Sequence, residues 1–320
     1  MANTTRTQIP AEVNNFYDRT LLEKAVPYFV HNKWAQVRDI PRNAGTNVIK
    51  FRRYGLLTAN TTALTEGVTP SGTQLSITDI TATVAQYGDY VTSTDVVSYE
   101  TYDPILTETA DVLGEQAGDS LDQLARNVMV AGASVQYASS ASSVATVAGS
   151  MKLNRAEVKE GVRTLKGNNA KPITSMIDSS TGYNTTPLNA AFIGIVHPDT
   201  TYDLDDATGW IPVEKYANKT DVMPNEVGSL AGVRFVESTN AYTTAGTLVS
   251  TVYGTLIFGQ HAYAQTRISG EALKNIVKPL GSAGTADPLD QRWTSGWKAT
   301  YVAKVLNANF IIVIYHAVSA

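Results

Sequence analysis

Two stretches in the first third of the chain alternate between apolar and polar residues, as strands do. They span residues 46–57 and 74–92, and we expect them to form the two long strands of one hairpin. In the second stretch the alternation slips by one residue near Thr78–Asp79, which predicts a β-bulge there. Ten residues at about 3.3 Å each would give an arm roughly 30 Å long.

The segment that joins these strands, about residues 58–73, has no pattern of its own. Its small polar residues include one charged residue, Glu66, and three turn formers, Gly67, Pro70 and Gly72, which we expect to shape the loop. An isolated two-stranded hairpin is at best marginally stable in water, so this excursion needs a surface to lie on. The sequence leaves open whether that surface belongs to the same chain or to a neighbour.

The strongest helical pattern follows. Asp103–Pro104 is a favourable start, and apolar residues then recur every three or four positions from Ile105 to about Val130. Two glycines, Gly114 and Gly118, interrupt this helix at a cost of about 1 kcal/mol each relative to alanine. They indicate either close packing or a bend.

The remaining elements are shorter. A capping box at Thr20–Glu23 predicts a helix that Pro27 interrupts, and the segment to about residue 43 is too poor in apolar surface to be a domain. Residues 131–150 form a connector or an edge strand. Helices are expected at 154–166 and about 199–206, and strands at 190–196, 233–236, 255–258, 298–306 and 310–316.

Composition narrows the classes of partner. The net charge of −4 argues against a nucleic-acid coat held by a basic stripe. The absence of cysteine excludes disulfides and thiolate metal sites. The first residues lack the apolar core of a signal peptide, and the longest apolar run, Phe310–Tyr315, is far shorter than the ~20 residues that cross a bilayer. We therefore expect no membrane partner.

Motifs of catalysis are weak. The four histidines do not pair at metal-ligand spacing, Gly228–Gly232 has its serine in the wrong place for a hydrolase elbow, and Gly254–Gly259 lacks the lysine of a phosphate loop. The aspartates of 199–206 could hold a cation, but an acidic first helical turn is favoured. We predict no catalytic, cofactor or metal site, and no enzyme.

The order of the elements is an arm, a long hairpin, one long helix, a mixed α/β region, and a return to strands beside the helix. Local matches lie at IKFRRY (49–54), LTEGVTPSG (64–72), QYGDYV (86–91), LDQL (121–124), VHPD (196–199), GSLAGVRFVEST (228–239) and GSAGTADPLDQRWTSGWK (281–298). Together they resemble the major capsid protein of tailed bacteriophages, an α+β protein with the Hong Kong 97-type fold.

This resemblance implies five regions. They are an N-terminal arm (1–43), an E-loop hairpin (44–92), a P-domain with a long spine helix (93–150), an A-domain (151–284), and strands that return to the P-domain (285–320). The hairpin would then be an E-loop whose fold another subunit completes.

The resemblance also implies a function. The chain would self-assemble into pentamers and hexamers of an icosahedral head around double-stranded DNA, which it would not bind specifically. Its other partners would be a separate scaffold protein, a portal and a decoration protein, and assembly would take place in the host cytoplasm. The alternative is another virion structural protein, such as a tail-tube subunit.

Four charged residues of the hairpin are candidate inter-subunit contacts: Lys50, Arg52, Arg53 and Glu66. They form a charge cluster on an element without a core of its own. The alternative is that the arginines are solvated edge-strand charges that prevent aggregation.

Overall fold

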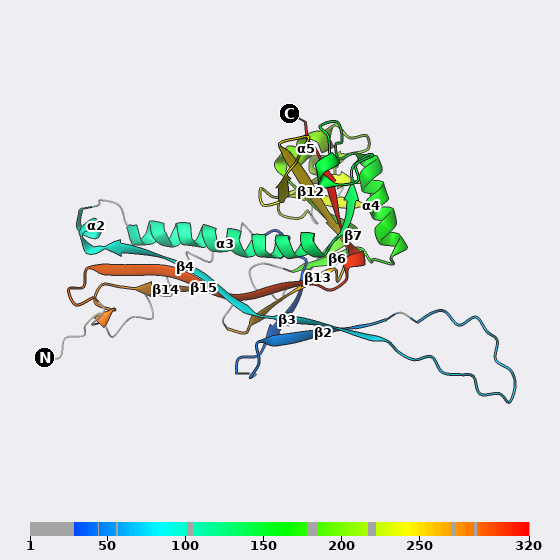
Figure 1. Ribbon diagram of the computed structural model, residues 1–320, viewed down its shortest axis with the longest axis horizontal. Coiled ribbons are helices and arrows are strands. Elements are labelled where there is room, and N and C mark those ends of the chain that lie inside the picture. The colour runs from blue at the N-terminus through cyan, green and yellow to red at the C-terminus, as the bar shows by residue number, and fades with distance from the viewer. Residues whose placement is uncertain are drawn as a thin grey trace.

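The computed structural model describes residues 29–43, 45–55, 57–100, 105–177, 185–216, 222–270, 273–284 and 287–319 (Figure 1). The helix predicted from Thr20 and the start signal at Asp103–Pro104 lie outside these residues.

A long sheet forms one part of the molecule. Its longest strand, β15 (Arg292–Val305), pairs antiparallel with β4 (Ala85–Thr94) on one side and with β14 (Leu273–Lys278) and β13 (Tyr263–Ile268) on the other. β1 (Gln36–Ile40) pairs parallel with β13. The short helix α2 (Asp95–Glu100) follows β4 at the far end of this sheet (Figure 1).

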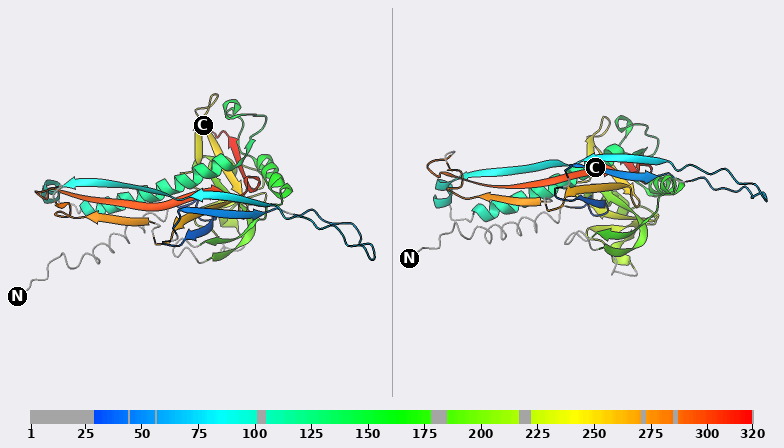
Figure 2. Two further views of the ribbon diagram at one scale, coloured as in Figure 1. Left: turned by 60° about the horizontal axis from the view of Figure 1, so that its bottom comes forward. Right: turned by 90° about the horizontal axis from the view of Figure 1, so that it is seen from below.

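The helix α3 (Ile105–Gly132) lies along the long sheet (Figures 1 and 2). Its apolar stripe packs on alternate residues of β15, which all point to one face of the sheet. The buried residues of this contact are Leu113, Ala117, Leu121 and Ala125 from the helix and Trp297, Ala299, Tyr301 and Ala303 from the strand. The predicted helix from Ile105 to about Val130 is therefore confirmed.

A nine-stranded sheet forms the second part. Its order is β5 (Ser134–Tyr137), β16 (Ile311–His316), β12 (Thr251–Phe258), β7 (Thr185–Val196), β10 (Val233–Glu237), β9 (Glu226–Leu230) and β8 (Ile211–Pro212). β11 (Tyr242–Ala245) and β6 (Ile173–Ile177) pair with β12 and β7. Two buried clusters line this sheet, one including the helix α4 (Arg155–Gly167) and the other including Met129 of α3.

Most of the shorter predicted elements are present. The helix expected at 154–166 is α4 (Arg155–Gly167), and the Asn154 side chain caps it by accepting from the backbone N–H groups of Ala156 and Glu157. The acidic helix is α5 (Pro198–Asp205). Residues 131–150 contain β5, which lies at an edge of the nine-stranded sheet, and the 3₁₀ turn Val144–Thr146.

The hairpin differs from its prediction. β2 (Val48–Tyr54) pairs with β3 (Ile77–Thr83), but the chain changes partner at Val84, and residues 85–94 pair with β15 instead. The expected second strand, 74–92, is therefore two strands in two sheets. Period-2 patterning could not reveal the change, because an exposed strand alternates in the same way whichever neighbour it pairs with.

The predicted β-bulge near Thr78–Asp79 is wrong. The register between β2 and β3 is unbroken from Val48 opposite Thr83 to Tyr54 opposite Ile77. The slip in the pattern has another cause: Ile80 and Ala82 face the body of the protein, whereas Ile77 lies on the opposite, exposed face.

Both ends of the described chain also depart from expectation. The end of the predicted arm is packed rather than free, because Val30, Trp34 and Ala35 are buried and β1 belongs to the long sheet. At the C-terminal end, β15 lies beside α3 as expected. β16 does not return to the long sheet but pairs with β12 and β5 in the nine-stranded sheet.

Candidate functional site

Among the residues that the structure describes, no group of three or more His, Asp or Glu side chains could hold a metal ion. No helix of that part of the chain is long and apolar enough to cross a membrane. The near-miss at Gly228–Gly232 is the turn between β9 and β10, where Ala231 and Gly232 have φ of +54° and +86°.

Two aspartates of the acidic helix α5 accept hydrogen bonds from other parts of the chain. Asp199 accepts a hydrogen bond of 2.6 Å from the Tyr253 hydroxyl, and Asp203 accepts from both the hydroxyl and the backbone N–H of Ser319. The Lys152 ammonium lies 3.4 Å from Asp203. These contacts hold α5 against the C-terminal residues, so Asp199 and Asp203 already have partners within the chain. Among the described residues, the hairpin is then the most unusual surface.

The base of the hairpin packs on the protein. Phe51 of β2 and Ala82 of β3 are buried together with Ala264 of β13, and Ile49 and Ile80 lie against them. Because Phe51 is directly opposite Ile80, and Ile49 is opposite Ala82, one face of the two-stranded sheet is apolar exactly where it meets the body. Beyond this base the hairpin leaves the protein, pointing away from α2 (Figures 1 and 2).

Arg52 already has a partner in its own chain. Its Nε lies 3.0 Å from Oδ1 of Asp79, and a second nitrogen lies 3.4 Å from Oδ2, so the pair is bidentate. The hydrogen bond from Arg52 lowers the pKa of Asp79. Both side chains are exposed. This geometry gives Arg52 a partner within the hairpin, and its contact with another subunit stays a prediction.

The other predicted contact residues are placed differently. Lys50, Arg52 and Arg53 line a cleft of about 630 Å³ between the hairpin and the body, and Arg38 of β1 adds a further cation to its wall. Glu66 lies far along the hairpin, in the exposed loop, and the structure offers its carboxylate no ion-pair partner among the described residues. The loop charge and the base charges are not brought together within one chain.

The loop itself is largely extended, and its residues are exposed from 57 to 76. Few hydrogen bonds order it: the N–H of Val68 donates to the Thr65 carbonyl, closing a turn in which Gly67 has φ of +79°. Glycine adopts that backbone more readily than other residues do, which is consistent with a turn at Gly67, and its loop-shaping role stays a prediction. Pro70 and Gly72 lie in the extended part, and their predicted role stays a prediction.

Large apolar side chains are exposed along the hairpin. Leu64 is 75% exposed and Val68 62% exposed, and four more are at least half exposed: Tyr54, Leu57, Leu75 and Ile77. Several large apolar side chains exposed on one extended element favour its contact with another surface. The alternation pattern could not reveal this surface, because residues 58–73 have no pattern of their own.

Gly114 and Gly118 lie within α3, and both are buried. The helix continues through them without interruption. Their proposed role in bending stays a prediction.

Sequence reasoning missed a buried contact at Asp122. This carboxylate is fully buried beside His31, although aspartate is almost never fully buried unless it is paired. A signal existed: Gly118, Asp122, Ala125 and Met129 follow at helical spacing, so Asp122 occupies the buried stripe of α3.

Of the comparisons with known proteins, only the one with solved structures gives matches. No protein-family model matches the sequence, and no curated protein matches it. Solved structures do match. The capsid of Ralstonia phage GP4 has a TM-score of 0.70 at 13% identity, covering 91% of this chain and 89% of that chain.

Two other solved structures extend the likeness. The cyanophage Pam1 capsid has a TM-score of 0.63 at 15% identity, covering 93% of this chain and 92% of that one. A virus-like particle from Pyrococcus furiosus has a TM-score of 0.51 at 11% identity, covering 95% and 100%. Along nearly its whole length, the chain has the mixed α+β fold of these phage capsid proteins.

Proposed function

We propose that this chain is a structural major capsid protein, which self-assembles into the pentamers and hexamers of an icosahedral phage head around double-stranded DNA. The observation that carries the proposal is the likeness to the GP4 capsid over 91% of the chain. The exposed hairpin supports it, because an element with so little core of its own needs a neighbouring surface. A tail-tube subunit is not favoured, since the matched structures reported above are capsids and a virus-like particle.

The fold is proposed to be of the Hong Kong 97 type. In that assignment the hairpin is the E-loop, α3 is the spine helix of the P-domain, and the nine-stranded sheet belongs to the A-domain. Sheet pairing supports one change to the predicted boundaries: β16 would join the A-domain with β12, whereas β15 stays in the P-domain.

The remaining attributes follow from the capsid role. The protein would act without catalysis, be assembled in the host cytoplasm and reside in the virion. Scaffold, portal and decoration proteins would be its accessory partners. The DNA would be enclosed without specific binding, as the net charge of −4 also favours.

Electron microscopy of the purified full-length protein in negative stain tests this proposal. We expect closed icosahedral shells. Open tubes would favour the tail-tube alternative, and a stable monomer under all assembly conditions would contradict both.

A further inference from the structure

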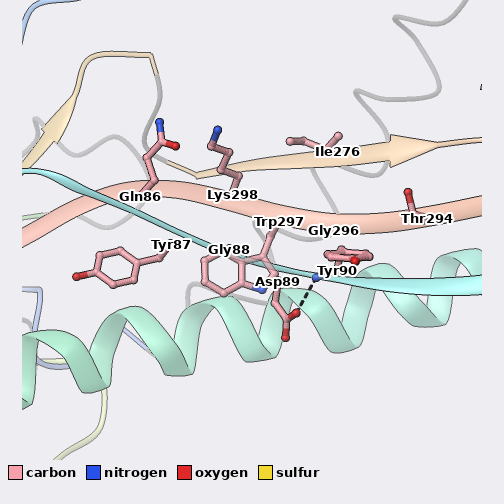
Figure 3. Close-up of a pocket in the computed structure, with 10 residues that line it drawn as sticks. All are labelled: Gln86, Tyr87, Gly88, Asp89, Tyr90, Ile276, Thr294, Gly296, Trp297 and Lys298. Carbon is pink, nitrogen blue, oxygen red and sulfur yellow. Dashed lines mark hydrogen bonds between the residues drawn. The ribbon is translucent and has the colours of Figure 1, made fainter. Parts of the chain in front are cut away.

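The cleft between the hairpin base and the body, which we call the hairpin cleft, has apolar walls. Ile49 and Ile80 line it from the hairpin, and Leu306 and Phe310 line it from the body. Its volume of about 630 Å³ exceeds that of the hollow over Gly296 on the long sheet, which measures about 370 Å³ (Figure 3). The hairpin cleft is within the size range of clefts that bind ligands.

Two arginines face the hairpin cleft from its two walls. On β2, alternation places Arg53 on the same face as Phe51, which packs on Ala264 of the body. On β1, Arg38 lies two residues beyond the partner of Ala264, and therefore on the same side of the sheet. Both arginines are exposed and belong to the lining of the cleft.

The other charged residues of the lining already have partners within the chain. Arg52 is bound to Asp79, and the same carboxylate attracts the Lys50 ammonium. Asp39, which is the acidic residue of the lining, accepts a hydrogen bond of 3.2 Å from Nε of Arg267. None of these groups is left to balance a further positive charge in the cleft.

Arg38 and Arg53 are different. The structure shows no hydrogen bond or ion pair between either guanidinium and the described residues. His261, which also lines the cleft, can add only positive charge. Like charges beside apolar walls are less well screened than charges in open water, so carboxylates placed between the two arginines would be stabilising. Arginine is also the cation whose planar fork fits a carboxylate.

A surface of complementary character lies at the end of α5. Tyr202, Asp205 and Asp206 are three and four residues apart, so they share one side of the helix. We call these three residues the α5 face. Tyr202 is 69% exposed, and both aspartates are exposed. Neither carboxylate has a hydrogen bond or ion pair among the described residues. The α5 face thus offers two carboxylates and an aromatic ring, all of which are groups that arginine binds.

Two other acidic surfaces match the cleft less well. Glu108 and Glu115 are exposed on α3, but seven residues separate them by about 10 Å along the helix, so one guanidinium cannot contact both. The exposed residue between them on that side is Val112, which has no ring for an arginine to stack on. Glu66 in the hairpin loop is a single carboxylate.

The hairpin cleft and the α5 face are well apart within one chain (Figure 1). The helix α5 is held beside the C-terminal residues by the contact of Asp203 with Ser319. Any contact between the two surfaces is therefore a contact between two copies. Because it joins different patches of the two copies, it can repeat around a ring, as pentamers and hexamers require.

We propose that the hairpin cleft of one copy binds the α5 face of a second copy. Asp205 and Asp206 would lie near Arg38 and Arg53, and the Tyr202 ring would lie against the apolar walls. This contact rests on the proposed function, since it is one of the contacts that would build the ring of a capsid.

Reversal of the charges on both surfaces of the full-length chain tests the proposal. Self-association is measured by analytical ultracentrifugation. Arg38→Glu/Arg53→Glu should weaken it about tenfold or more, because two attractions become repulsions, and Asp205→Arg/Asp206→Arg should do the same. The chain that carries all four changes should associate nearly as well as wild type. Arg38→Gln/Arg53→Gln, which introduces no repulsion, should weaken association less than the reversal does.

Matched controls separate this contact from general charge effects. Lys159→Glu/Lys166→Glu reverses two exposed lysines of α4 and should associate like wild type. Glu108→Arg/Glu115→Arg, combined with the reversed cleft arginines, should not restore association. Tyr202→Ala should weaken association several-fold without a change of charge.

The outcomes that would overturn this contact are distinct from the failure of the capsid role. Undiminished association of Arg38→Glu/Arg53→Glu, or no recovery in the chain with four changes, would overturn the contact, whereas closed shells of the wild-type chain would leave the proposed function standing. Recovery through Glu66→Arg or Glu108→Arg/Glu115→Arg would assign the hairpin cleft to another surface and would also overturn it. A wild-type chain that stays monomeric under all assembly conditions would contradict both.

Discussion

The Nδ1 atom of His31 lies 2.7 Å from Oδ2 of Asp122, and both side chains are completely buried. The other carboxylate oxygen accepts hydrogen bonds from the backbone N–H groups of Val30 and His31, at 2.8 and 2.7 Å. The Tyr263 hydroxyl donates to the His31 carbonyl. One carboxylate on α3 therefore fixes the segment that leads into β1.

Replacing Asp122 by alanine should lower the free energy of unfolding by about 3–5 kcal/mol, the range seen when one partner of a buried charged pair is removed. The physical reason is that two backbone donors and an imidazole lose their acceptor while still buried. Urea denaturation of the dissociated chain measures this.

Asp119→Ala is the matched control. Asp119 lies on the same helix, is only partly buried, and accepts a hydrogen bond of 2.8 Å from Gln123. Its replacement should change stability by no more than about 0.5–1 kcal/mol. Equal losses from the two variants would mean that the Asp122 contacts carry no special share of stability.

The helix α3 could be predicted because its information is local. Apolar residues spaced by three and four from Ile105 onward define its buried stripe without reference to any other segment. The partner of Asp122 could not be predicted in this way, because His31 is 91 residues away and nothing in either local pattern names the other.

Strand pairing shows the same limit. Residues 85–94 were correctly expected to be extended, but their partner, β15, lies about 200 residues later in the chain. Exposed strands of this kind carry no apolar face that would select a neighbour. The positions of the hairpin charges can be read from the sequence, but the bidentate contact of Arg52 with Asp79 depends on a register that only the structure gives.

His316 should make stability depend on pH. Burial lowers its pKa to about 4, against opposing effects of the Ala317 carbonyl and the Asp203 charge. In an unfolded chain the pKa of histidine is about 6.5, so the unfolded state binds the proton first as pH falls. The contribution of His316 is therefore complete above about pH 6.5 and is lost between about 6.5 and 4, at about 1.4 kcal/mol per pH unit and roughly 3 kcal/mol in all.

Urea denaturation at several pH values between neutral and acidic measures this dependence in wild type and in His316→Gln. The variant loses the hydrogen bond of 2.9 Å with Thr255 and should start less stable, but its stability should fall less steeply over this window. His261→Asn is the control, since His261 is exposed and asparagine tolerates its φ of +59°. Identical slopes for wild type and His316→Gln would contradict the assignment.

Two of the hairpin charges, Arg53 and Glu66, should matter only in the assembled particle. Arg53→Ala and Glu66→Ala should each lower the melting temperature of particles while leaving that of the dissociated chain unchanged, because the described residues give Glu66 no partner within the chain. The loss per contact is small, about 0–1 kcal/mol for exposed pairs, but a shell repeats it many times.

Arg52→Ala provides the contrast for this experiment. Its guanidinium is bound to Asp79 of the same chain, so its replacement should affect the dissociated chain as well. Particles of Arg53→Ala and Glu66→Ala that assemble and melt like wild type would remove the case for cross-subunit ion pairs in the hairpin.

Gly118→Ala tests whether the long helix must bend. Alanine raises the helical propensity at this position by about 1 kcal/mol, so a bending role predicts a chain at least as stable as wild type whose shells assemble or expand abnormally. A packing role predicts the reverse, a less stable chain, because Gly118 is buried and an added methyl group would have to displace its neighbours. Denaturation and electron microscopy of particles before and after expansion measure both properties.

Gly161→Ala in α4 is the matched control, since a Cβ there would meet its nearest neighbours at 3.4 and 3.5 Å, which is ordinary contact. Normal assembly and expansion of Gly118→Ala would count against the bend.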